Sequence, residues 1–236
     1  VCRNTCKVFK MNRYLITSGC SFSETHSTHF ESWPEHLLKL LPKYSLISKG
    51  LASQGNGLIS RGIIYEVSQN LDEDIKVGVM WSGSDRYEVW SKEPMFENVD
   101  GWVENPTGFI PKKKHWQILN PHWMVHKSDI YYTHLHEQMY GWINTLEHIL
   151  RTQWFLEKHN IPYFMSFMKD PKFPKYKELK HLMDLINWNT FLPVDGMYEW
   201  CDGCEGIADH PSQEQHEQFV RGVILDHLLI DNYNWI

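Results

Sequence analysis

The sequence predicts one α/β domain with a central parallel β-sheet. Short apolar runs alternate with amphipathic segments along most of the chain, which is the pattern of parallel strands joined by crossover helices. The 236 residues are enough for a single domain with a substantial core. With 42% apolar and 22% charged residues the composition is that of an ordinary globular protein, and no apolar run approaches the roughly 20 residues of a membrane span.

Four short apolar runs are the predicted strands. The first, Arg13–Ser18, contains the apolar run that starts at Tyr14, and Gly19 follows it. The other three are Tyr44–Ser48, Ile75–Ser82 and Ile161–Phe167. Because an amphipathic segment separates each strand from the next, we expect the strands to lie parallel.

Five segments with helical spacing of apolar residues are the predicted helices. In chain order they cover Pro34–Leu41, Leu58–Asn70, about Tyr131 to His159, Tyr176–Trp188 and Gln213 to about Ile230. Ser32 is a candidate N-cap of the first. The third carries a stripe that we assign to the core, namely Trp142, Leu146, Ile149, Gln153 and Leu156. The last has the clearest start, because Ser212 and Gln215 stand at capping-box spacing ahead of an apolar face.

One long segment, about Arg86 to Ser128, interrupts the alternation. It is rich in Trp, Pro, His and Asn and shows no clear periodicity. A connection this long inside a compact domain is usually a functional lid or an Ω-type loop, so we interpret 86–128 as an aromatic-rich insertion over one end of the sheet. Residues 1–10 precede Met11 and could be a leader. The prediction is therefore a single domain over 1–236 with these two additions.

Charge and cysteine content narrow the function classes. The chain has 23 basic and 29 acidic residues, a net charge of −6, and its basic residues are scattered apart from the Lys112–Lys114 triplet, which argues against a nucleic-acid partner. No apolar stretch of signal-peptide length precedes Met11, and five cysteines are an odd number. We therefore expect a reducing, cytoplasmic location without a membrane partner, with association with a virion left open.

Four polar segments fall where ligands bind in an open parallel sheet, outside the carboxyl ends of the strands. Ser21 follows the first strand, and Gly50–Gly57 follows the second. Trp81–Arg86 ends the third strand, and Asp209–Ser212 lies just ahead of the capped last helix.

These four segments, in this order, resemble the blocks of the SGNH (GDSL-like) hydrolase family. Gly19-Cys20-Ser21 matches the Gly-Asp-Ser block, and Gly55 matches the glycine of the second block. His210 stands immediately before a proline, and His216 follows six residues on, as in the last block. The resemblance implies a flavodoxin-like three-layer α/β/α sandwich, with Ser21 as nucleophile and His210 as its base. It also implies that the N–H groups of Ser21 and Gly55 bind the oxyanion.

The chain departs from the family at three positions. Cys20 replaces an aspartate that has a structural role in the family. Ser84 stands where the third block offers an asparagine, if Asp85 is aligned with that block's aspartate. The triad acid usually precedes the histidine by three residues, where this chain has Ile207. Asp209 is the favoured replacement, with Asp202 or a backbone carbonyl as alternatives.

The sequence therefore predicts a serine esterase that needs no cofactor and removes an acyl group, for example acetyl, from a carbohydrate or another small polar ester. The aromatic insertion would form part of the acyl or sugar pocket. The rival is a non-catalytic glycan-binding or virion-associated protein that keeps the fold. Cys201 and Cys204 have the spacing of half a zinc site, which Cys2 and Cys6 could complete, but a disulfide or plain thiols are the favoured interpretation. The oligomeric state is not indicated.

Overall fold

The structure is a computed structural model that describes residues 11–25, 31–90, 116–119, 121, 126–206 and 209–230. The predicted leader, residues 1–10, and most of the insertion 86–128 lie outside these ranges, as do Cys2, Cys6 and the Lys112–Lys114 triplet. Among the described helices, none combines the length and the apolar composition needed to cross a membrane.

A parallel sheet of four strands forms the centre of the described chain, in the order β2-β1-β3-β6. The strands are β1 (Arg13–Ser18), β2 (Ser45–Ser48), β3 (Asp74–Trp81) and β6 (Tyr163–Phe167). All four predicted strands are confirmed to within two residues at either end. Because β2 and β3 lie on opposite sides of β1, the strand order reverses at β1. The crevice outside its carboxyl end is where this type of sheet binds ligands.

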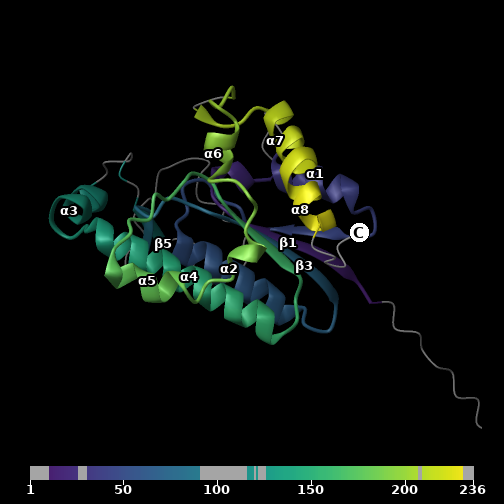
Figure 1. Ribbon diagram of the computed structural model, residues 1–236, viewed down its shortest axis with the longest axis horizontal. Helices are drawn as coiled ribbons and strands as arrows, with labels where there is room; N and C mark the ends of the chain where they lie inside the picture. The colour runs from purple at the N-terminus through teal and green to yellow at the C-terminus, as the bar shows by residue number, and fades with distance from the viewer. Residues whose placement is uncertain are drawn as a thin grey trace, which may run out of the picture.

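Helices cover both faces of the sheet (Figure 1). One face carries α2 (Asn56–Gln69), α4 (Gln138–Lys158) and α5 (Lys177–Met183), whose apolar residues form one buried cluster with the sheet. A second buried cluster joins the other face to α1 (Trp33–Leu40) and to the C-terminal helical run. That run consists of α7 (Gln213–Phe219), the π-helical turn η5 (Val220–Ile224) and α8 (Leu225–Ile230). Two cores on either side of one sheet make the predicted three-layer α/β/α sandwich.

Two of the predicted helices are divided. The helix expected over 131–159 is α3 (His126–His134) followed by α4, and His136 in the break packs its ring against Tyr87, Tyr131 and Tyr132. Those tertiary ring contacts replace the helical continuation that the sequence pattern favours. The helix expected over 176–188 ends as α5 at Met183, and the 3-10 turn η3 (Trp188–Thr190) follows.

The remaining elements lie near the carboxyl edge of the sheet. They are the 3-10 turn η1 (Ser21–Ser23), the short helix α6 (Met197–Trp200), and an antiparallel pair of strands, β4 (Tyr87–Trp90) and β5 (Trp116–Leu119). The pair β4–β5 belongs to the insertion, where the sequence showed no periodicity.

Candidate functional site

Ser21 and His210 lie in hydrogen-bond contact although 189 positions separate them in the chain. The distance between Ser21 Oγ and His210 Nε2 is 2.7 Å. Ser21 opens η1 directly after β1, and His210 lies just before the N-cap of α7. Both side chains are partly exposed, and the ring of Phe22 lies 5.2 Å from the imidazole. A hydroxyl and an imidazole placed in this way can share a proton.

Gly19 allows η1 to pack tightly against the end of the sheet. A Cβ at this position would lie 2.2 Å from Ser23 Oγ and 3.0 Å from the Met80 carbonyl oxygen. The φ angle of Gly19 is not in the left-handed region, so the glycine is required for close approach rather than for a special turn. The indole of Trp33 donates a hydrogen bond to Ser23 Oγ at 2.8 Å. These contacts fix η1, and with it Ser21, between β3 and α1.

The backbone around His210 is held by the start of α7. The predicted capping box is confirmed, because Ser212 Oγ accepts from Gln215 N–H at 3.2 Å and Gln215 Oε1 accepts from Ser212 N–H at 2.9 Å. On the other side, Gly206 N–H donates to the His210 carbonyl at 2.7 Å. His210 is therefore anchored through its own backbone and through the cap that follows it.

The second histidine of the last block has a different environment. His216 is fully buried, and this burial, followed by the nearby charges of His36 and His210, lowers its pKa to about 3. His216 is consequently neutral at physiological pH. It forms part of the interior between α1 and α7 and not part of a proton-transfer pair with Ser21.

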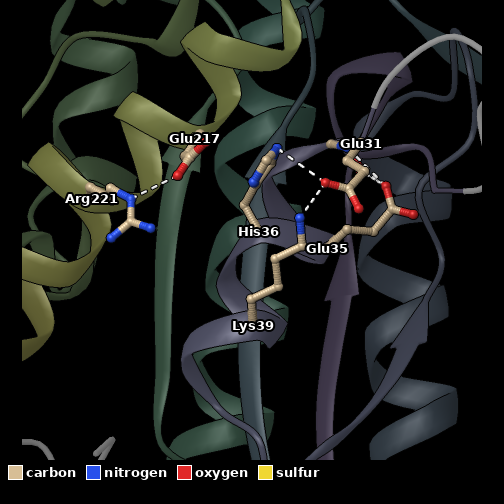
Figure 2. Close-up of polar contacts among 7 residues, drawn as sticks. Glu31, Glu35, His36, Lys39, Glu217 and Arg221 are labelled. Atoms are coloured by element: carbon tan, nitrogen blue, oxygen red, sulfur yellow. Dashed lines mark hydrogen bonds and ion pairs between the residues drawn. The ribbon is translucent and has the colours of Figure 1, made fainter.

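Charged side chains surround the buried His36 at the surface of α1 and α7 (Figure 2). His36 Nε2 lies 3.9 Å from Glu31 Oε2, and Lys39 pairs with the same carboxylate. Arg221 donates to Glu217 at 2.9 Å on the neighbouring helix. Exposed pairs of this kind contribute little to stability because water and salt screen them, so we assign this cluster to the surface and not to the site.

Comparison with known proteins bears on the fold. No protein-family model and no curated protein sequence matches the chain. A crystal structure of TesA, a GDSL/SGNH protein, matches with a TM-score of 0.50 and 9% identity, over 91% of this chain and 97% of that one. The fold is that of the SGNH hydrolases. At this identity the likeness shows the fold alone, so the site must be judged from the residues of this chain.

Gly55, the match to the second SGNH block, does not offer its N–H to a ligand. That N–H donates to Glu88 Oε1 at 2.5 Å, and Glu88 also accepts from the Leu58 N–H, so the carboxylate caps the N-terminus of α2. The Glu88 side chain is only 3% exposed, and burial raises its pKa to about 7. The expectation for Gly55 is thus corrected, because a residue of the insertion occupies its hydrogen-bonding group.

Ser53, in the same loop, is a different candidate donor. Its φ of 62° lies in the left-handed region, and among the described residues no hydrogen bond engages its N–H. Leu51 N–H donates to the Gly19 carbonyl at 3.2 Å, which places this loop beside the turn that precedes Ser21. Sequence reasoning missed Ser53 because only the backbone conformation distinguishes it.

Ser84 and Asp85, the candidates of the third block, form hydrogen bonds with residues of the neighbouring helices α4 and α3. Ser84 Oγ accepts from Gln138 Nε2 at 2.9 Å, and the backbone carbonyl of Asp85 accepts from the Tyr132 hydroxyl. Within the described ranges neither residue contacts Ser21 or His210. The structure therefore does not bring these two predicted residues to the Ser–His pair.

The carboxylate expected at the triad is not provided by Asp209. Its side chain is exposed, its φ is 57°, and in the described part of the chain it makes no hydrogen bond or ion pair with His210. Asp202, the alternative, is also exposed, in the turn between Cys201 and Cys204. Both backbones adopt left-handed conformations, which the sequence spacing does not reveal.

Glu24 has a carboxylate whose charge interacts with that of His210. It follows η1, its N–H donates to the Ser21 carbonyl at 3.4 Å, and its carboxylate accepts the Ala52 N–H. Burial raises the pKa of Glu24, while the Ala52 N–H and the charge of His210 act in the opposite direction. In the sequence, the only indication that Glu24 could act on His210 is its position three residues after the candidate nucleophile.

Cys201 and Cys204 are free thiols that pack partly buried beside the core. Among the described residues, no three His, Cys, Asp or Glu side chains are grouped as a metal site. The zinc hypothesis also involved Cys2 and Cys6, which lie outside the described residues.

Proposed function

We propose that the protein is a serine hydrolase that removes an acyl group, such as acetyl, from a carbohydrate or another small polar ester. The single observation that supports this proposal most directly is the 2.7 Å contact between Ser21 Oγ and His210 Nε2 at the carboxyl end of β1. A fold by itself does not specify a reaction, whereas a nucleophile in contact with its base specifies a step.

In this proposal His210 acts as the general base. The Ser21 hydroxyl donates to Nε2, so the imidazole removes the proton as Oγ attacks the ester carbonyl carbon. The imidazolium then gives this proton to the departing alcohol oxygen, and an acyl group remains on Ser21. A water molecule, deprotonated by the same imidazole, hydrolyses the acyl-enzyme and releases the acid.

Two backbone N–H groups are the proposed donors to the oxyanion. They belong to Ser21 and Ser53, and within the described residues neither takes part in a hydrogen bond. Each such donor typically contributes about 3 kcal/mol to lowering the barrier. Glu24 would stabilise the imidazolium through its negative charge, in the role for which the sequence analysis favoured Asp209.

The polar, sugar-like substrate class is supported by an aromatic cluster that includes Tyr87 of the insertion. Tyr87 and Tyr140 stack in parallel with their ring centroids 6.1 Å apart, and Tyr140 is 55% exposed. Tyr131 packs against Tyr87 at 5.0 Å. Exposed aromatic faces with hydroxyl groups at their rims suit the alternating apolar and polar surface of a carbohydrate.

Labelling with a fluorophosphonate probe tests this proposal, because only an activated serine reacts. The wild type and a Ser68→Ala control, which changes an exposed serine of α2, should be labelled and should hydrolyse p-nitrophenyl acetate. Ser21→Ala should show neither reaction, with a melting temperature close to that of the wild type. A wild type that is not labelled would instead favour the non-catalytic glycan-binding alternative.

A further inference from the structure

A pair of thiols lies beside the loop that carries His210. Cys201 ends α6, and Cys204 follows after a turn in which Asp202 and Gly203 have φ angles of 48° and 109°. Both angles are in the left-handed region, so the chain reverses sharply between the cysteines. Cys201 and Cys204 both pack, partly buried, against the same core cluster. The tight turn thus holds two thiols, three positions apart in the chain, against one cluster.

This turn is bonded directly to the His210 loop. The side-chain amide of Gln215 donates to the Gly203 carbonyl at 2.8 Å, and its oxygen accepts from Glu205 N–H at 3.0 Å. Gly206 N–H donates to the His210 carbonyl at 2.7 Å. A restraint on the turn therefore acts on the backbone of His210 and on the cap of the helix that follows it.

We propose that Cys201 and Cys204 form a reversible disulfide that fixes this turn and, through it, the His210 loop. The oxidant is a low-molecular-weight disulfide such as glutathione disulfide. The Cys204 thiolate attacks one sulfur of the oxidant and displaces a glutathione thiolate. The Cys201 thiolate then attacks the Cys204 sulfur of the mixed disulfide and displaces the second glutathione thiolate. The pair gives up two electrons and two protons, and two molecules of glutathione leave.

The surroundings of the pair make this exchange slow at neutral pH. Burial raises the pKa of Cys201 to about 12 and that of Cys204 to about 11. The neighbouring carboxylates of Glu199, Glu205 and Asp209 raise these values further. Because the thiolate is the reactive species, oxidation should become faster as the pH rises.

The test compares the purified full chain after incubation with glutathione disulfide or with dithiothreitol at about pH 8.5, where more thiolate is present. After alkylation and proteolysis, the peptide that holds Cys201 and Cys204 should be lighter by two hydrogens and carry no alkyl group. The melting temperature of the oxidised chain should be higher by about 4 °C, the effect of closing a very short loop in a chain of this size. Dithiothreitol should reverse both changes.

Matched variants separate this pair from the other thiols. Cys201→Ser and Cys204→Ser should each abolish both changes, whereas a variant with serine at both Cys2 and Cys6 should retain them. A glutathione adduct without the internal bond, zinc retained by the pair, or an internal disulfide that leaves the melting temperature unchanged would each overturn the proposal. None of these measurements requires ester hydrolysis. Only a further expectation, that oxidation raises the temperature of half-inactivation by the same amount, rests on the proposed function.

Discussion

Replacement of Glu88 by glutamine should change how the stability of the protein depends on pH. Glu88 accepts two N–H groups at the start of α2, and Arg61 Nη1 lies 3.9 Å from its Oε2. Burial nevertheless raises its pKa from 4.5 to about 7. Because the folded chain then holds the proton more tightly than the unfolded chain, the unfolding free energy decreases as the pH rises between these values. The contribution of Glu88 is fully present below pH 4.5 and is lost as the pH rises through about 7.

The expected loss is about 3 kcal/mol, since a difference of one pKa unit corresponds to about 1.4 kcal/mol. Glutamine keeps an oxygen for the Gly55 N–H but does not ionise, so Glu88→Gln should gain about 2–3 kcal/mol relative to the wild type between about pH 5 and pH 8. Urea unfolding followed by tryptophan fluorescence measures this difference. Glu147→Gln, an exposed change on α4, is the control and should show no such trend. A Glu88→Gln difference that is independent of pH, or that shrinks as the pH rises, would refute the reasoning.

Three further changes test the site and its support. Glu24→Gln should lower kcat/KM about tenfold, the effect of about 1.4 kcal/mol, and should move the acidic limb of the pH–rate profile to lower pH. Asp209→Asn should change neither quantity. If Asp209→Asn has the same effects as Glu24→Gln, the role proposed for Glu24 alone is wrong. Gly19→Ala should destabilise the protein by about 3 kcal/mol through overpacking, while Gly222→Ala, whose Cβ meets nothing within 4 Å, should not destabilise it in the same urea titration. Ser212→Ala should cost about 1 kcal/mol by removing a helix cap, and an unchanged midpoint would contradict the capping role.

The sequence was sufficient where a feature depends on residues close together in the chain. The four strands are short apolar runs, and the capping box at Ser212 and Gln215 is a pattern over four residues that the structure confirms. Ser21 and His210 were predicted from short segments that resemble SGNH blocks, and their side chains lie 2.7 Å apart in the structure. Each lies at the edge of a local element, and the carboxyl ends of parallel strands meet at one edge of the sheet.

The sequence did not predict where the long helix divides, because the break follows from rings that reach His136 from β4 and α3. The pair of strands β4 and β5 was missed as well, since a two-stranded antiparallel pair of four residues each leaves little periodicity to detect.

The sequence by itself determined the α/β/α class and the two residues that form the candidate nucleophile and base. Only the tertiary structure decided which polar groups remain available around them. Gly55 loses its N–H to Glu88, a partner 33 positions away, and Glu24, which is distant from His210 in the chain, has a carboxylate whose charge interacts with that of His210. A hydrogen-bonding group in a folded chain is used by whichever buried partner reaches it, and that depends on the packing of distant segments and not on spacing along the chain.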